Sequence, residues 1–142
     1  MSTRLAALIN IALIIAIVVD LSLVVMVTVA PDLWFDLLHG EAEVPRNVVL
    51  LRRAGAHWFA FLVFQVAALT QWRRQPLWLV FIAGLRFSDL FTDATYLAVG
   101  DDLTPLAWAS LSTPPFLNLG MGLLCLHGFR QTVSAADSSG ST

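Results

Sequence analysis

Several residues that can carry charge or donate a proton stand inside an apolar stretch, "GLRFSDLFTDATYL", residues 84–97. A helix turns 100° per residue, so four polar side chains fall within an arc of about 80°: Arg86, Asp89, Asp93 and Tyr96. If the stretch spans a membrane, a charge facing lipid costs about 2.5 kcal/mol or more. We therefore expect the arc to face other helices, where such groups form ion pairs, transfer protons or bind a polar ligand.

Ionisable residues of two other apolar segments are expected at the same depth. At 1.5 Å per residue, Asp93 lies roughly 24 Å and Arg86 roughly 14 Å into its segment. Asp20 lies roughly 22 Å into the first segment. Arg53 and His57 share one face near the start of the second segment. The predicted level, in the outer half of the bundle, holds six ionisable residues: Asp20, Arg53, His57, Arg86, Asp89 and Asp93.

The charges of this set are nearly balanced, which predicts a buried network. We expect Arg86 to pair with Asp89 or Asp20, because a buried charge is tolerated when it is paired. Arg53 is expected to pair with Asp93. Asn118 follows two prolines in "STPPFLNLGMG" on the fourth segment, which predicts a kink. The kinked segment either forms one wall of a pocket or is a kinked helix without a further role.

Composition indicates the solvent that these segments face. The chain has 142 residues, of which 58% are hydrophobic and 13% charged, whereas soluble domains usually carry about 25% charged residues. Four segments are long and apolar enough to span a membrane. The first could instead be a signal peptide, but a secretory apolar region has only about 7–15 residues. The predicted spans are 5–30, 53–72, 77–99 and 105–129.

The predicted fold is all-α, an integral membrane four-helix bundle. A short interfacial helix is expected after the first span, because Pro31 can open it, Gly40 can end it and Trp34 suits an interface; an ordinary loop is the alternative. Residues 1–130 form a single four-span domain, and the polar segment 131–142 is expected to be a disordered tail.

Arginine placement predicts the orientation. Positive residues are enriched in cytoplasmic loops, and four spans place Arg4, Arg73, Arg74 and Arg130 on one side. The opposite side receives most of the acidic residues between spans, although Arg46, Arg52 and Arg53 depart from the pattern. We therefore expect both termini in the cytoplasm of a bacterial cell, with the chain integral to the inner membrane.

Several classes of function are disfavoured by the sequence. The single Cys125 excludes an intrachain disulfide, a CxxC pair and a thiolate zinc cluster. The chain has no HExxH, nucleophile motif or glycine-rich phosphate loop, so we expect no metal and no cofactor. A net charge of −2 without a basic run predicts no nucleic-acid partner. An enzyme is not the favoured class, although Asp89, Asp93 and His57 could do acid–base chemistry on a lipid-soluble substrate.

Two functions stay open. In the favoured one, the charged network holds the helices of a small membrane protein that acts as an accessory or assembly subunit, because apolar helices in lipid associate through polar contacts and small residues. In the alternative, the network is a polar pocket that binds a small lipid-soluble ligand or couples it to protons. The expected partners are membrane lipids, other membrane subunits or further copies of this chain.

Two stretches carry a family resemblance, "LLRRAGAHWFAFLVFQVAAL" and "WRRQPLWLVFIAGLRFSDLFTD". They resemble the small four-helix bacterial membrane proteins grouped as DoxX-like or as domains of unknown function. In those proteins an arginine and a glycine recur at the start of the second helix, and an arginine recurs in the third. The matching positions here are Arg53, Gly55 and Arg86. The resemblance implies a four-helix membrane fold and names no activity.

Overall fold

The computed structural model describes residues 2–40, 45–100 and 103–139. These residues contain no strand, so the prediction of an all-helical chain is confirmed. Within the same residues six helices follow one another: α1 (Thr3–Val29), α2 (Pro31–His39), α3 (Pro45–Gln71), α4 (Leu77–Val99), α5 (Pro105–Ser112) and α6 (Pro114–Ser139).

The first helices begin and end at the residues that the sequence marks. The hydroxyl of Ser2 accepts a hydrogen bond from the backbone N–H of Leu5 and caps α1. Pro31 ends α1, because the residue before a proline avoids helical geometry, and it also opens α2. Gly40 ends α2 with φ 64°, a left-handed conformation that glycine adopts without strain. The short helix expected after the first segment is therefore present.

Three boundaries differ from the expected ones. α3 begins at Pro45, before the expected Arg53, because Arg52 and Arg53 interrupt the apolar run but, as good helix formers, do not interrupt the helix. The fourth segment is divided into α5 and α6 at Thr113, since Pro114 lacks an N–H and clashes with the preceding turn. The segment expected to be a disordered tail instead continues α6 to Ser139, as no proline or glycine interrupts 129–139. Residues 140–142 lie outside those described.

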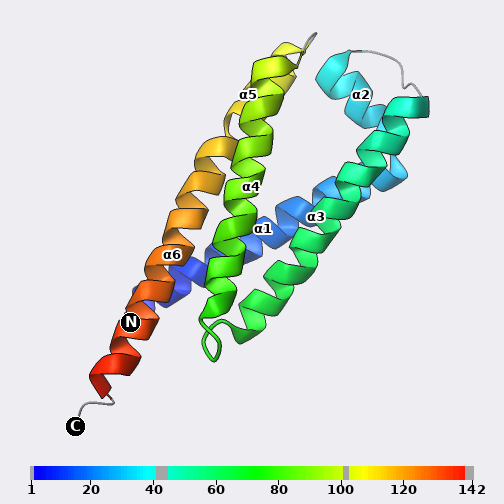
Figure 1. Cartoon of the computed structure of the whole chain (residues 1–142). Helices are drawn as coiled ribbons and strands as arrows, with labels where there is room; N and C mark the ends of the chain where they lie inside the picture. Colours follow the sequence, from blue (N-terminus) through cyan, green and yellow to red (C-terminus); the bar gives the residue numbers. More distant parts are fainter. Residues whose placement is uncertain (1, 41–44, 101–102, 140–142) are drawn as a thin grey trace.

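The four long helices lie in the order α1, α3, α4, α6 around the molecule. α1 runs along α3 and α4 runs along α6, and weaker contacts join α3 to α4 and α1 to α6 (Figure 1). The start of α1 and the end of α6 lie toward the same end of the molecule as the turn between α3 and α4 (Figure 1). The short helices α2 and α5 contact each other at the opposite end.

Two apolar clusters form the core, one toward each end. The larger cluster lies near the termini and includes Ile9, Leu13, Trp72, Leu79 and Cys125. The smaller cluster joins α1, α2 and α3. Along α1 the larger cluster ends at Leu13 and the smaller one begins at Val27. The middle of the molecule lies between them and is occupied by polar side chains.

Candidate functional site

Each long helix contributes one buried polar side chain to the middle of the molecule. The exposed fraction of these four residues is between 0% and 6%, and two further carboxylates of α4 lie beside them. Buried polar groups are tolerated when they bind one another. We name the set the polar layer: Asp20, Gln65, Arg86, Asp89, Asp93 and Asn118.

The guanidinium of Arg86 is the centre of the polar layer. Its Nη2 donates to Oδ2 of Asp20 at 2.9 Å. Its Nη1 donates to Oδ1 of Asn118 at 3.3 Å and lies 3.5 Å from Oδ2 of Asp89. The Cζ atom lies 5.4 Å from the ring centroid of Phe61 on α3, within range of a cation–π contact. One arginine thereby contacts side chains of all four long helices.

Asp20 receives donors from two helices on one oxygen. Besides Arg86, the amide of Gln65 donates to Oδ2 of Asp20. The carboxylate therefore joins α1 to both α3 and α4. Two buried atoms have no hydrogen-bond partner among the described residues, Oε1 of Gln65 and Nε of Arg86. The polar layer is thus not fully satisfied by its own members.

Asn118 connects Arg86 to the remaining carboxylates. Its Oδ1 accepts from Arg86, and its Nδ2 donates to Oδ2 of Asp93 at 3.0 Å and Oδ2 of Asp89 at 3.4 Å. The carbonyl oxygen must face a cation and the NH₂ must face acids, so these contacts fix the orientation of the amide. A residue of α6 thereby positions two acids of α4.

The formal charges of the polar layer do not cancel. It contains three carboxylates and a single guanidinium, which gives −2 when all are ionised. Asp20 and Asp89 form ion pairs with Arg86. Among the described residues, Asp93 is held by the amide of Asn118 and belongs to no ion pair. The surplus negative charge therefore lies at the Asp93 end of the layer.

A cavity of about 580 Å³ borders the polar layer. Apolar side chains of α1 and α6, among them Ile15, Val19 and Leu124, form most of its wall. Trp34 of α2 and Trp58 of α3 complete it. All members of the polar layer except Gln65 line it as well. Its volume and its apolar wall with a few convergent polar groups are those of a small-molecule site.

A second cavity, of about 400 Å³, lies between α2, α3 and α4. Tyr96 and His39 line it, and their side chains are hydrogen bonded through Oη and Nε2 at 2.5 Å. Trp34 and Trp58 form a tilted aromatic pair with ring centroids 5.6 Å apart. This pair and Asp93 border both cavities. Asp93 and the two tryptophans therefore stand where the cavities meet.

The structure brings together five of the eight residues that the sequence singled out: Asp20, Arg86, Asp89, Asp93 and Asn118. The predicted pairing of Arg86 with Asp20 or Asp89 is present with both partners. Tyr96 lies apart from the polar layer, against His39. Whether these residues bind a ligand stays a prediction.

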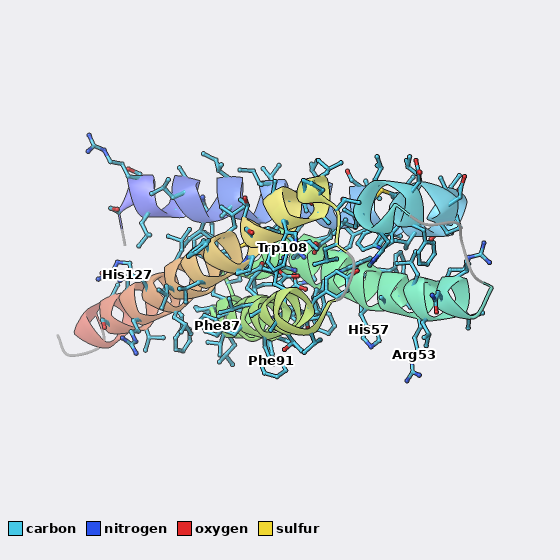
Figure 2. All side chains as sticks on the ribbon, turned by 90° about the horizontal axis from the view of Figure 1, so that it is seen from above. Arg53, His57, Phe87, Phe91, Trp108 and His127 are labelled. Carbon is cyan, nitrogen blue, oxygen red and sulfur yellow. The ribbon has the colours of Figure 1, made fainter. Side chains whose placement is uncertain are left out.

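Arg53 and His57 do not join the others, which corrects their placement. Both are exposed, and Figure 2 shows them pointing away from the neighbouring helices. The Nδ1 atom of His57 lies 2.9 Å from the carbonyl oxygen of Arg53, within their own helix. Gly55 of α3 faces Val27 of α1. Arg53 and His57 are each two positions from Gly55, so they lie about 200° around the helix and face away from α1. The expected pair between Arg53 and Asp93 is therefore wrong.

Two residues of these sites escaped the sequence analysis. Gln65 is fully buried and binds Asp20, and its signal was a lone amide inside the apolar run "FLVFQVAAL". A charge-based search passes over it because an amide is neutral. His39 binds Tyr96 from a helix that lies outside the predicted spans. Its contact depends on how α2 docks, and no local pattern encodes that.

No group of His, Cys, Asp or Glu residues suited to a metal ion occurs in the part of the chain that the structure describes. No protein-family model, curated protein or solved structure matches the chain. The resemblance to DoxX-like proteins therefore stays a prediction, and the function has to be inferred from the geometry of the polar layer and its cavities.

Proposed function

We propose that the chain is an integral membrane protein with four spans that binds a small lipid-soluble molecule in the cavity beside the polar layer. The observation that carries the binding function is this cavity of about 580 Å³, with an apolar wall and a polar end of unbalanced charge. A polar layer with a purely structural role would satisfy its own groups, whereas Oε1 of Gln65 and Nε of Arg86 find no partner within the part of the chain that the structure describes.

The distribution of side chains supports the membrane location. Among the described residues, two helical stretches are long enough to span a bilayer and contain a sufficiently apolar 18-residue window, Thr3–Val29 with a mean hydropathy of 2.8 in that window and Pro105–Ala135 with 1.2. The surface is apolar where the interior is charged. On α4, Phe91 points outward and is 73% exposed, whereas Arg86 is 4% exposed (Figure 2). Water would favour the reverse arrangement, and lipid favours this one.

The orientation in the membrane follows from the arginines. The turn between α3 and α4, which carries Arg73 and Arg74, lies toward the same end as both termini (Figure 1). Arg4 and Arg130 are exposed near those termini. Positive loops stay in the cytoplasm. We therefore assign both termini to the cytoplasmic side of the inner membrane and the α2 end, with the second cavity, to the outer side.

A structural role is the second candidate, and one observation favours it. α1 packs along α3 and more weakly against α6, and the ion pair of Asp20 and Arg86 adds a polar link from α1 to α4. In lipid, such polar contacts hold helices together. A subunit that assembles with other membrane proteins needs this link and no ligand.

Filling the cavity tests the binding function. Gly120 lines the cavity and a Cβ atom there meets nothing within 4 Å, so we expect Gly120→Phe to be tolerated and its ring to occupy the cavity. Gly84 on α4 is exposed, equally open and outside both cavities, so Gly84→Phe is the matched control. Each protein is purified in mild detergent, and native mass spectrometry measures bound small molecules and lipids.

The expected result is a bound species on the wild type and on Gly84→Phe that is lost from Gly120→Phe. Equal occupancy of all three proteins places the bound species outside the cavity and contradicts the proposal. No bound species on any of them leaves the structural role as the better function.

A further inference from the structure

The cavity that the proposed function requires has features that select the charge of its ligand. Its polar end holds the carboxylates of Asp20, Asp89 and Asp93, and Arg86 is the one cation among the described residues that line it. Asp20, Asp89 and Asn118 already occupy both Nη atoms of Arg86, and only its Nε lacks a partner among the described residues. An anionic ligand would meet three carboxylates against this one guanidinium, so the surplus negative charge disfavours it.

Aromatic side chains line the same cavity as Asp93, the carboxylate of the polar layer that forms no ion pair with any described residue. Trp34 and Trp58 stand with ring centroids 5.6 Å apart and line the cavity together with Asp93. The face of a tryptophan ring attracts a cation within about 6 Å, and such aromatic groups recognise quaternary ammonium ions. This observation is independent of the carboxylates and points to the same ligand charge.

The remaining wall of the cavity is apolar and determines what kind of body the ligand has. Alanine, valine, leucine, isoleucine and methionine side chains of α1 and α6 surround most of the space. Such a wall favours a body of hydrocarbon or aromatic rings and offers few hydrogen-bonding groups. The cavity volume of about 580 Å³ lies in the range of sites for drug-sized molecules.

We propose that the ligand of this cavity is a lipophilic cation, an organic amine or onium ion whose apolar body fills the cavity and whose charge lies between Asp93 and the pair of tryptophans. The inference rests on the proposed binding function and adds the chemical class of the ligand. The cation balances charge that the protein itself leaves uncompensated, which a neutral molecule of the same shape cannot do.

Two probes of nearly equal shape and opposite charge test this. Radiolabelled tetraphenylphosphonium and tetraphenylborate are titrated against the full-length protein in nanodiscs, and empty nanodiscs give the lipid background. We expect saturable binding of tetraphenylphosphonium at least about tenfold tighter than that of tetraphenylborate. Gly120→Phe should abolish this binding, and Gly84→Phe should retain it.

A charge-removing pair of variants locates the cation. Asp93→Asn keeps the shape of the side chain and should weaken tetraphenylphosphonium about tenfold or more. Asp36→Asn makes the same change on the exposed part of α2, outside both cavities, and should leave the affinity unchanged. Asp89→Asn is the second variant if Asp93→Asn does not elute as a folded species.

The outcomes separate the two proposals. Saturable binding of tetraphenylborate that Gly120→Phe removes, without binding of tetraphenylphosphonium, overturns the lipophilic cation and leaves the ligand cavity standing. Binding of neither probe, together with an empty cavity by mass spectrometry, overturns both. Equal weakening of tetraphenylphosphonium by Asp36→Asn and Asp93→Asn shows a surface charge effect and also overturns the inference.

Discussion

At the scale of single residues, Arg86 determines how the polar layer is built. Its side chain is almost fully buried and contacts two carboxylates, an amide oxygen and an aromatic ring. Burying an arginine is costly unless its charge is compensated. The nearest partner is Asp20 on another helix, whose Oδ2 lies 2.9 Å from Nη2 of Arg86. Each of these two residues therefore compensates the buried charge of the other.

We expect Asp20→Asn to lower the free energy of unfolding by about 1.5–3 kcal/mol, because asparagine can still accept from Arg86 but no longer compensates its buried charge. Unfolding in a titration of mild detergent with sodium dodecyl sulfate measures this. Arg86→Gln in the Asp20→Asn background should recover part of the loss, since the unpaired guanidinium is removed as well. The double-mutant cycle should give a coupling of about 0.5–3 kcal/mol.

Arg53→Gln is the matched control for Arg86→Gln. It makes the same change at an exposed arginine that the structure places outside the polar layer. Its effect should stay within about 0.5 kcal/mol, as is usual for surface substitutions. Strictly additive effects of Asp20→Asn and Arg86→Gln, or a loss at Arg53 as large as at Arg86, would contradict the described network.

At the scale of helices, the close approach of α4 and α6 depends on a missing side chain. A Cβ atom at Gly122 would lie 2.5 Å from the ring of Phe87, so the two helices have no room for it. Gly84, on the exposed side of α4, has nothing within 4 Å of a Cβ. The same substitution at these two glycines should therefore have opposite effects.

Gly122→Ala should destabilise the protein by about 1–3 kcal/mol, because the added methyl overpacks the interface. Gly84→Ala should stabilise it by about 0.5–1 kcal/mol, because alanine is the better helix former and meets no neighbour. Thermal unfolding in mild detergent measures both. A stabilising effect of Gly122→Ala would mean that Phe87 moves aside easily and that this glycine does not set the helix spacing.

The same scale shows what the sequence could predict. The helix Leu77–Val99 has the expected bounds, because Pro76 precedes it and Gly100 follows it. The arc on α4 was also found, since three charges at helical spacing leave one acceptable face. On α3 the sequence predicts that the face of Arg53 and His57 points inward, because charges are a stronger signal than the single amide of Gln65. Which face of α3 points inward depends on the contact of Gly55 with α1, and the sequence of α3 alone does not determine that contact.

At the scale of the whole molecule, polarity is reversed relative to a protein in water. Large apolar residues are exposed along α1, α3, α4 and α6, and the charged polar layer lies inside. The apolar clusters above and below this layer are small. Much of this apolar surface has no protein partner in a single copy of the chain, and in the proposed membrane location lipid or another subunit covers it. If the chain spans a membrane as proposed, the end that carries the positive charge predicts its topology.

We expect the α3–α4 turn and α2 to lie on opposite sides of the membrane. Cys125 is buried, and Cys125→Ser provides a background without cysteine. Gln75→Cys in the turn and Asp36→Cys on α2 add one exposed thiol each. In intact cells a membrane-impermeant maleimide should label Asp36→Cys and reach Gln75→Cys only after permeabilisation, because positive loops remain cytoplasmic. Equal labelling of both variants would contradict the proposed orientation. Recovery of the protein in the soluble fraction after a carbonate wash would contradict its integration into the membrane.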